Sequence, residues 1–238
     1  MKQILGKADL HIHSEFSGDC FTSIQDILAT AQKRKLDVIA ITDHHTFQGF
    51  MEAEKIAPQF GVKLIKGEEI KTKQGDLIAL FIDELIKPRR DILETIREVH
   101  QQGGLAIVPH PFSFWQTSVS FKTLIKIYQE LDGLEVFNNS RWWLNPTSQR
   151  RLIGFNQQNL NLAEIGSSDA HIKDQIGLAY TAFQGNTPND LYFSIKNRLT
   201  RSQKNNNFST VFKTGLKLIP TQPLRILKYL FNHNEPSL

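Results

Sequence analysis

The chain has 238 residues, of which 40% are hydrophobic and 22% are charged, a composition typical of a folded globular protein and not of a disordered or membrane-embedded one. Six of the 28 basic residues and one of the 24 acidic residues lie in residues 201–238, so residues 1–200 hold 22 basic and 23 acidic residues. The net charge of +4 therefore belongs to the C-terminal end, and the main body is not a general polyanion binder.

No apolar run reaches the roughly 18 residues needed to span a bilayer, and the first residues lack the pattern of a signal peptide. We therefore expect a cytoplasmic protein. The only cysteine, Cys20, excludes an internal disulfide and a cysteine-based zinc cluster, and we expect it to be an inert thiol. Any metal ligands must be histidine, aspartate or glutamate.

Short apolar runs alternate with longer helical patterns along the chain. The apolar runs predict eight strands, over residues 7–13, 37–42, 63–71, 77–82, 105–109, 134–138, 162–167 and 179–183. The segments between them predict six helices, over residues 23–35, 46–59, 90–102, 120–131, 146–158 and 188–200. Because strand and helix alternate, we expect an α/β fold with a mainly parallel sheet.

The first predicted strand contains Asp9, His11 and His13 at every second position. Side chains two residues apart share one face of a strand, so these three point the same way. A pair of imidazoles on one face suits a metal ion, but such a pair also occurs by chance in half-buried strands. Residues elsewhere in the chain are needed to distinguish the two interpretations.

Further metal-binding residue types follow other predicted strands. In α/β barrels the reacting groups lie at the C-terminal ends of the strands and in the loops after them. Six of the eight histidines are at or just after such ends, and glutamates and an aspartate share this position. This placement favours a metal site on one rim of the barrel. The residues concerned are His11, His13, His44, His45, Glu68, Glu69, His110, Asp169 and His171.

The motifs along the chain resemble those of the PHP (polymerase and histidinol phosphatase) domain, in order and spacing, over about residues 5 to 200. They are Asp9-Leu10-His11-Ile12-His13-Ser14, Ser17-Gly18-Asp19, Thr42-Asp43-His44, Gly67-Glu68-Glu69-Ile70, Pro109-His110-Pro111 and Ser168-Asp169-Ala170-His171. The resemblance implies a distorted seven-stranded (β/α)7 barrel similar to a TIM barrel. It also implies up to three divalent cations and the cleavage of phosphoesters, as in stand-alone metal-dependent phosphoesterases.

The same resemblance implies three metal positions that share ligands. Glu69 bridges the first and second metals, and Glu69, Asp169 and His171 are the expected catalytic residues. The first metal is expected on His11, His13, Asp169 and Glu69, the second on Glu69 and His110, and the third on Asp19, His44 and His171. Imidazole and carboxylate ligands without thiolate favour Mn²⁺, Zn²⁺ or Fe²⁺.

One position departs from the family pattern, because Asp76 follows Gly75 where many members have a histidine ligand of the second metal. Asp76 either replaces that histidine or is a turn residue, so the sequence predicts two or three ions. Asp9 and Asp43 are assigned either to the orientation of ligating imidazoles or to hydrogen bonds at strand ends. His45 is interpreted as a rim residue.

Clustered cations would lower the pKa of a water molecule and direct hydroxide at phosphorus, so the resemblance implies hydrolysis of a small phosphate ester, for instance a nucleotide. Lys71 and Arg141 are candidate substrate-binding cations, with solvated loop cations as the alternative. Trp142 and Trp143 either stack on the substrate or cover the barrel end. The competing functions are a nuclease for nucleic-acid ends, which the near-neutral body disfavours, and a catalytically silent module.

The C-terminal end has a different composition. We divide the chain into a barrel over residues 1–200 and a basic amphipathic extension over residues 201–238, which begins with a polar linker, Ser-Gln-Lys-Asn-Asn-Asn, after Arg201. Residues 208–231 mix apolar and basic side chains, which predicts either peripheral contact with an anionic membrane or packing on the barrel itself. The oligomeric state stays open.

Overall fold

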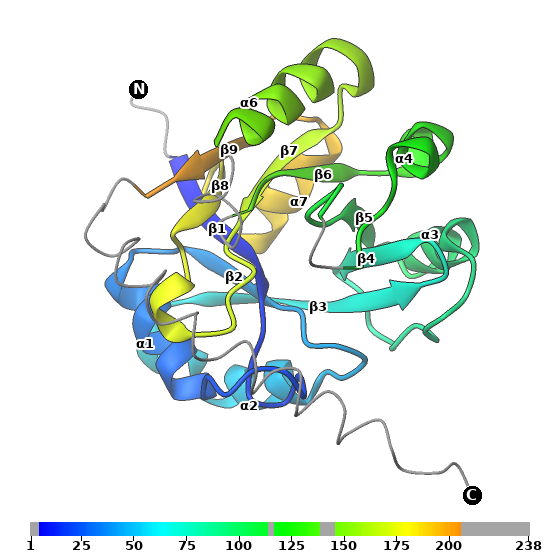
Figure 1. Ribbon diagram of the computed structural model, residues 1–238. Coiled ribbons are helices and arrows are strands. Elements are labelled where there is room, and N and C mark those ends of the chain that lie inside the picture. Colours follow the sequence, from blue (N-terminus) through cyan, green and yellow to red (C-terminus); the bar gives the residue numbers. More distant parts are fainter. Residues whose placement is uncertain (1–4, 114–116, 139–145, 206–238) are drawn as a thin grey trace, which may run out of the picture.

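The computed structural model describes residues 5–113, 117–138 and 146–205, which form a barrel-shaped sheet surrounded by helices (Figure 1). The strands are β1 (Leu5–Ile12), β2 (Val38–Ile41), β3 (Lys63–Thr72), β4 (Gly75–Leu80), β5 (Leu105–Val108), β6 (Gly133–Asn138), β7 (Ala163–Ser167), β8 (Ala179–Gln184) and β9 (Arg201–Lys204). The helices are α1 (Ile24–Lys33), α2 (Gln48–Ile56), α3 (Ile92–Gln101), α4 (Phe121–Ile127), α6 (Pro146–Phe155) and α7 (Pro188–Lys196). The eight predicted strands and six predicted helices are thus confirmed.

Side-chain oxygens at the helix N-termini explain where three of these helices begin. The Oγ of Ser23 accepts a hydrogen bond from the N–H of Asp26 at α1, and the carboxylate of Asp91 accepts one from Leu93 at α3. At α7, Thr187 and Asp190 form a capping box, with Pro188 in the first turn. Each cap satisfies a backbone N–H that has no partner within the helix.

The strands are ordered β7-β6-β5-β4-β3-β2-β1-β8-β9 in one sheet, of which four neighbouring pairs are parallel and four antiparallel. The expectation of a mainly parallel sheet is therefore wrong, because half of the strand pairs are antiparallel. A tight turn joins β3 to β4, and a parallel connection would need a longer crossover. β4 and β8 run against the other seven strands, which share one direction and so end on the same rim.

The two ends of the sheet meet between β7 and the β8–β9 pair. The hydroxyl of Thr181 on β8 donates to the carbonyl of Gly166 on β7 at 2.9 Å and accepts from its N–H at 3.1 Å. At the rim, the N–H of His13 donates to the carbonyl of Ala170 at 3.0 Å. These contacts nearly close the sheet into a distorted barrel.

The start of the polar stretch expected as a linker after Arg201 is instead a strand, because β9 pairs with β8. Its side chains are mostly exposed, so its polarity reflects an edge position and not a lack of pairing. A Cβ at Gly166 would lie 3.1 Å from atoms of Ser202 and Gln203, so this glycine lets β9 approach β7. Residues beyond Asn205, including the predicted amphipathic segment, lie outside the described residues.

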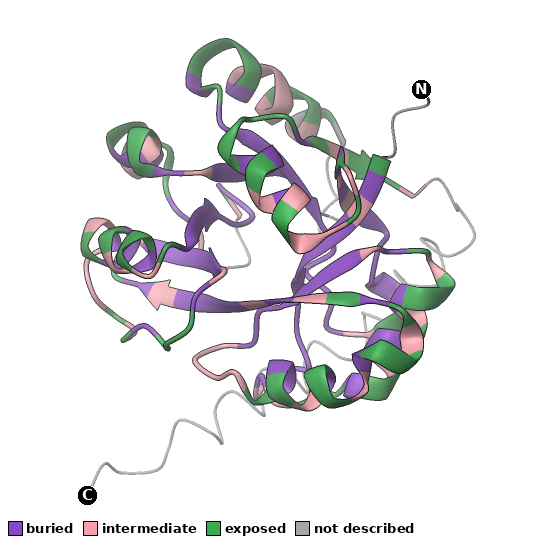
Figure 2. Ribbon diagram, turned by 180° about the vertical axis from the view of Figure 1, so that it is seen from behind, coloured by how far each residue is buried: buried purple, intermediate pink, exposed green. Residues whose placement is uncertain are grey.

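The apolar side chains of the strands pack under the helices, and Figure 2 shows buried strands inside a shell of helices with exposed outer faces. Alternation along β1 sends Leu10 and Ile12 into two apolar clusters, whereas Asp9, His11 and His13 lie on the other face. Within the described residues, none of the helices is long and apolar enough to cross a bilayer.

Candidate metal centre

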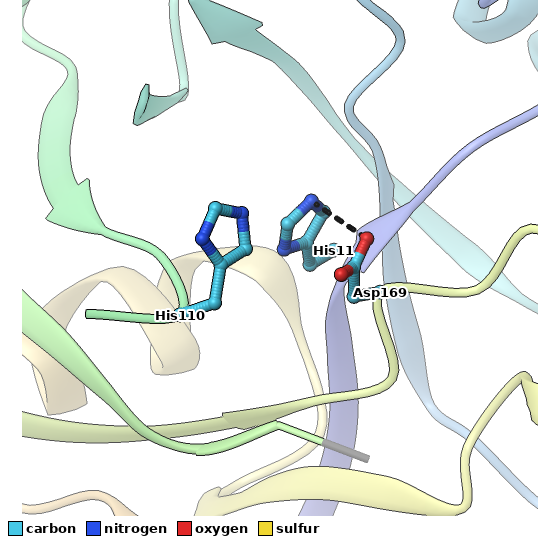
Figure 3. A group of neighbouring side chains, drawn as sticks. All are labelled: His11, His110 and Asp169. Atoms are coloured by element: carbon cyan, nitrogen blue, oxygen red, sulfur yellow. Dashed lines mark ion pairs between the residues drawn. The ribbon is translucent and has the colours of Figure 1, made fainter. Parts of the chain in front are cut away.

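The eight residues that the family motifs predict as metal ligands meet at the rim where the seven codirectional strands end. Six of them are buried, with His11, His13, Glu69, His110, Asp169 and His171 exposing at most 7% of their surface. Asp19 and His44 are half-buried at the outer side. Figure 3 shows His11, from β1, with His110 and Asp169 from the loops after β5 and β7, and marks the ion pair between His11 and Asp169 at 3.4 Å.

Glu69 is the centre of this cluster. One carboxylate oxygen, Oε2, lies 3.2 Å from Nε2 of His11 and 3.1 Å from Nε2 of His13. The same oxygen is 3.6 Å from Nε2 of His44, and the other oxygen, Oε1, is 3.0 Å from Nε2 of His110. Four imidazoles from the C-terminal ends of three strands, β1, β2 and β5, thus face one carboxylate, which is the arrangement expected of a bridging ligand.

The outer part of the cluster contains Asp19. Its Oδ2 lies 3.2 Å from Nε2 of His171 and 3.5 Å from Nε2 of His44. The ligand atoms of His13, Asp19 and His44 all lie within 4.8 Å of one another, and His13 also groups with Asp169 and His171. The three residues expected at the third metal are therefore neighbours, and the structure adds His13 as a shared member.

Asp76 is part of the cluster and not a turn residue. Because β4 is antiparallel to β3, its first residues lie at the rim where β3 ends, and Asp76 pairs with Lys71. Its ligand atom lies within 4.8 Å of those of Glu69 and His110. Burial and the nearby Glu69 carboxylate raise the pKa of Asp76 to about 7. Sequence alone left both interpretations open.

The donor set fits divalent cations. The Oδ1 atom of Asp76 is buried and has no hydrogen-bond partner within the described part of the chain. It lies beside a second carboxylate, Glu69, and two such groups repel unless a proton or cation lies between them. An oxygen of this kind suits a cation, and nitrogen and oxygen donors without thiolate suit Mn²⁺, Zn²⁺ or Fe²⁺.

The imidazoles and carboxylates of the cluster shift one another's pKa values in opposite directions. Burial lowers the pKa of His13, but hydrogen bonds to Asp169 and Glu69 more than offset this and raise it to about 10. The pKa values of His11 and His110 are also raised by these carboxylates against the effect of burial. Conversely, burial raises the pKa of Asp169, but the imidazoles outweigh it and hold it below its ordinary value. Without metal, protons therefore hold the imidazoles and carboxylates together.

Glu135 on β6 contacts the cluster in a way that the sequence did not define. It is 1% exposed, and its Oε1 lies 3.2 Å from Nδ1 of His11. It also accepts hydrogen bonds from the hydroxyl of Ser167, from the side chain of Asn138 at 2.8 Å and from the N–H of His110. A carboxylate on the far nitrogen of an imidazole fixes the ring and its tautomer. Glu135 thus orients His11 and anchors the loop that bears His110.

Asp9 and Asp43 do not orient a ligating imidazole as Glu135 does. The carboxylate of Asp9 accepts hydrogen bonds from the N–H groups of Ser168 at 3.0 Å and Gly177 at 2.7 Å, and burial raises its pKa to about 6. Asp43 accepts from the N–H and hydroxyl of Ser14. Of the two roles considered for them, the structure supports the strand-end hydrogen bonds, which fasten the loops after β1 and β7.

Cys20 has a supporting position beside the cluster. Its buried thiol donates to the carbonyl oxygens of His13 and His171, both at 3.2 Å. Burial raises the pKa of this thiol to about 11, so the reactive thiolate is scarce at neutral pH. These contacts agree with the expected inert thiol.

His45 and Lys71 line the cavity into which the cluster opens. His45 lies at the rim, with Nδ1 3.4 Å from the buried carboxylate of Glu68, which points away from Glu69. Lys71 lines a cavity of about 670 Å³ that also borders Asp19 and His44. Arg141, Trp142 and Trp143 lie outside the described residues.

Comparison with known proteins agrees with this geometry. The chain is 41% identical over 143 residues to an uncharacterized protein of Methanocaldococcus jannaschii, covering 56% of this chain and 81% of that protein. It is 41% identical over 105 residues to a 5'-3' exoribonuclease of Haemophilus influenzae, covering 42% of this chain and 38% of that enzyme.

Among solved structures, a two-domain protein from Bacteroides vulgatus that contains a predicted PHP-like metal-dependent phosphoesterase has a similar fold. Its TM-score is 0.72 at 22% identity, covering 89% of this chain and 70% of that chain. The sequence model of the PHP domain matches residues 9–197, which include all nine candidate ligands. The chain therefore belongs to the PHP domain family.

Proposed function

We propose that this protein is a metal-dependent phosphoesterase that hydrolyses a small phosphate ester, for instance a nucleotide. The observation that supports this most directly is the convergence of four imidazoles on Glu69 within a buried cluster open to a cavity. Two or three divalent cations, Mn²⁺, Zn²⁺ or Fe²⁺, are proposed as cofactors. When bound, such ions make water nucleophilic near neutral pH and neutralise the charge on the phosphoryl oxygens.

The residues of the chain have distinct proposed roles. Glu69 would supply a ligand oxygen to two of the cations, and Asp169 and His171 would hold a cation on the side of the cluster that contains Asp19. Lys71, half-buried at the end of β3, contributes positive charge for the phosphate group. No side chain is needed as a nucleophile in this proposal, which favours hydrolysis over transfer to a second substrate.

A nuclease acting on nucleic-acid ends is the second candidate. It is favoured by the similarity to the exoribonuclease of Haemophilus influenzae, which covers less than half of either chain. The near-neutral charge of residues 1–200 argues against a broad nucleic-acid surface. A catalytically silent module is disfavoured by the complete ligand set.

The test measures phosphate release from nucleotides and sugar phosphates, and degradation of labelled oligonucleotides, by protein supplied with Mn²⁺, Zn²⁺ or Fe²⁺. We expect release from small esters, and a loss of about 100-fold or more in Glu69→Gln, since a bridging ligand supports several kcal/mol of charge stabilisation. Glu164→Gln is the matched control, because this buried carboxylate on β7 contacts Gln157 and Ser202 away from the cluster. Equal activity in Glu69→Gln and the control would reject the proposal, and activity on oligonucleotides alone would favour the nuclease.

A further inference from the structure

Two basic stretches, residues 71–73 and 87–90, together form a basic segment that lines the same cavity as Asp19 and His44. The cavity, of about 670 Å³, is far larger than a phosphate group and has room for most of a small ligand. The cations of the basic segment are Lys71, Lys73, Lys87, Arg89 and Arg90.

Three of these cations have no acidic partner among the described residues. Arg90 forms ion pairs with Glu94 and Glu98, so its charge is balanced within the fold. None of the ion pairs within residues 5–113, 117–138 and 146–205 involves Lys73, Lys87 or Arg89, whose side chains are exposed. Positive charge therefore accumulates at one side of the cavity.

Hydrogen bonds fix residues 86–90 against the end of β3, the strand that carries Glu69. The N–H of Arg89 donates to the carbonyl of Lys71 at 2.6 Å, and the N–H of Lys73 donates to the carbonyl of Arg90 at 2.9 Å. At the start of the segment, the N–H of Ile86 donates to the carboxylate of Glu68 at 3.1 Å. Glu68 is fully buried next to Glu69, so the segment is built onto the same strand as the bridging ligand.

The number of cations exceeds what a single phosphate at the metal cluster requires. A phosphate there would be neutralised by the bound cations and by Lys71. The three further cations lie along the same cavity, where a second group of the bound molecule would reach them. Cations of this kind recognise phosphate through charge-assisted hydrogen bonds.

We propose that Lys73, Lys87 and Arg89 form a second anion site, and that the substrate carries a second phosphate group besides the one that is hydrolysed. This inference rests on the proposed phosphoesterase function and names its substrate class. The second phosphate remains on the product and sets the orientation of the ester bond at the cluster.

The test uses phosphonates, whose C–P bonds the proposed reaction does not cleave, so binding is measured without turnover. Calorimetry with the metal-loaded full chain compares alkane-1,n-bisphosphonates of three to six carbons with alkylphosphonates of the same length. We expect at least one bisphosphonate to bind about tenfold more tightly than its monophosphonate, since each exposed charge-assisted contact adds a few-fold. The triple variant Lys73→Gln, Lys87→Gln and Arg89→Asn should lose this preference.

The substitutions and the control are matched to the backbone. Arg89 has a φ of +60°, which asparagine tolerates better than most residues. Lys35→Asn is the control, because Lys35 is also an exposed cation, has a φ of +56° and lies before β2 at the other end of the barrel. The control should keep the preference for the bisphosphonate.

The outcomes separate the two proposals. Equal affinity of mono- and bisphosphonates at every length for the unsubstituted protein overturns the second anion site, even if phosphate esters are hydrolysed. A bisphosphonate preference that the triple variant retains also overturns it. A preference that the triple variant loses supports the site, even if no phosphate ester is turned over and the proposed function fails. In a further outcome, the unsubstituted protein binds mono- and bisphosphonates equally and the triple variant loses only oligonucleotide binding. This result assigns the three cations to a nucleic-acid backbone and overturns the inference.

Discussion

Two buried carboxylates in the centre, Glu69 and Glu135, differ in what surrounds their oxygens. Glu69 faces the Nε2 atoms of four imidazoles, all of which are ligand atoms of candidate metal groups. The oxygens of Glu135 accept instead from a serine hydroxyl, an asparagine amide and a backbone N–H, besides contacting Nδ1 of His11. Protein donors thus occupy Glu135, which makes it a positioning residue, whereas Glu69 is available to a cation.

The substitution Glu135→Gln tests this difference. The amide keeps the shape but removes the negative charge that holds the ring of His11 and the N–H of His110. We expect metal affinity to fall by about 10- to 100-fold, which is usual when a group behind a ligating histidine is changed. Calorimetric titration with Mn²⁺ measures it, with circular dichroism as the check on folding.

Glu164→Gln serves again as the control and should bind metal as the unsubstituted protein does. If Glu135→Gln folds and binds Mn²⁺ with unchanged affinity, Glu135 does not position the ligands. A change in the pH profile of binding would add support, because the tautomer of His11 depends on the Glu135 carboxylate.

The ligand residues could be predicted from the sequence because each motif is local. Alternation along β1 and the position of histidines after apolar runs place the histidines at one rim, whereas Asp19 and the choice of Glu69 over Glu68 rest on the resemblance to the PHP domain. Glu135 could not be assigned, because its role depends on His11 and on the loop of His110, 124 and 25 residues away. Asp9 and Asp43 could be placed at strand ends from the sequence, but their hydrogen-bond partners lie far away in the chain. Only the fold identifies these partners as backbone N–H groups.

At the scale of elements, the reversed strand β4 brings Asp76 to Glu69 and His110, where a second metal is predicted. A tight turn after β3 places the start of β4 at the rim where β3 ends. Asp76 therefore lies beside Glu69 and not at the opposite end of the barrel. The alternation of strand and helix indicated an α/β fold with a mainly parallel sheet, but the predicted strands over residues 63–71 and 77–82 have no helix between them, and so short a connection joins antiparallel strands. The edge strand β9 was missed for another reason, since its polar sequence is shared by loops and exposed edges.

Gly75 is the residue that allows the hairpin to close. Its φ is +136°, and a Cβ there would lie 2.5 Å from the backbone nitrogen of Val119. We expect Gly75→Ala to lower the free energy of unfolding by about 3 kcal/mol, from backbone strain together with displacement of the neighbouring loop. It should also weaken metal binding, because Asp76 is the next residue.

Gly61→Ala is the matched control for Gly75→Ala. Gly61 has a φ of +65°, but a Cβ there meets nothing within 4 Å, so only the conformational cost of about 1 kcal/mol applies. Urea unfolding of both variants, monitored by circular dichroism, separates the two contributions. Equal losses in the two variants would contradict the close approach of the loop to the start of β4.

For the whole molecule, the metal cluster is a concentration of charge inside the barrel rim. Its carboxylates and imidazoles come from segments between His11 and His171, so it connects both halves of the sheet. In the metal-free protein the raised pKa values of the imidazoles show that protons offset the carboxylates. Bound cations would replace those protons. Residues 208–231 of the basic extension lie outside the described residues, so their contact with an anionic membrane stays a prediction, with packing on the barrel as the alternative.

The stabilisation of the fold by metal should therefore grow with pH. The pKa of His13 is raised to about 10, above the unfolded value of about 6.5, so its contribution to metal-free stability is complete below pH 6.5 and is lost as the pH rises through 10. Metal competes with the same protons, so its affinity rises over this range. At 100 times the dissociation constant, binding adds about 2.7 kcal/mol, or about 5–10 °C in Tm for a chain of this size.

Differential scanning calorimetry with Mn²⁺ or with a chelator, at pH 6.5, 7.5 and 8.5, measures this gain in Tm. We expect the difference between the two conditions to increase at each step, because fewer protons must be displaced and because the chelated protein loses its protonated imidazoles. In Glu69→Gln the difference should be small at every pH, since the bridging carboxylate is gone. A gain that is constant or falls with pH in the unsubstituted protein would mean that the imidazoles of the cluster do not exchange protons for metal.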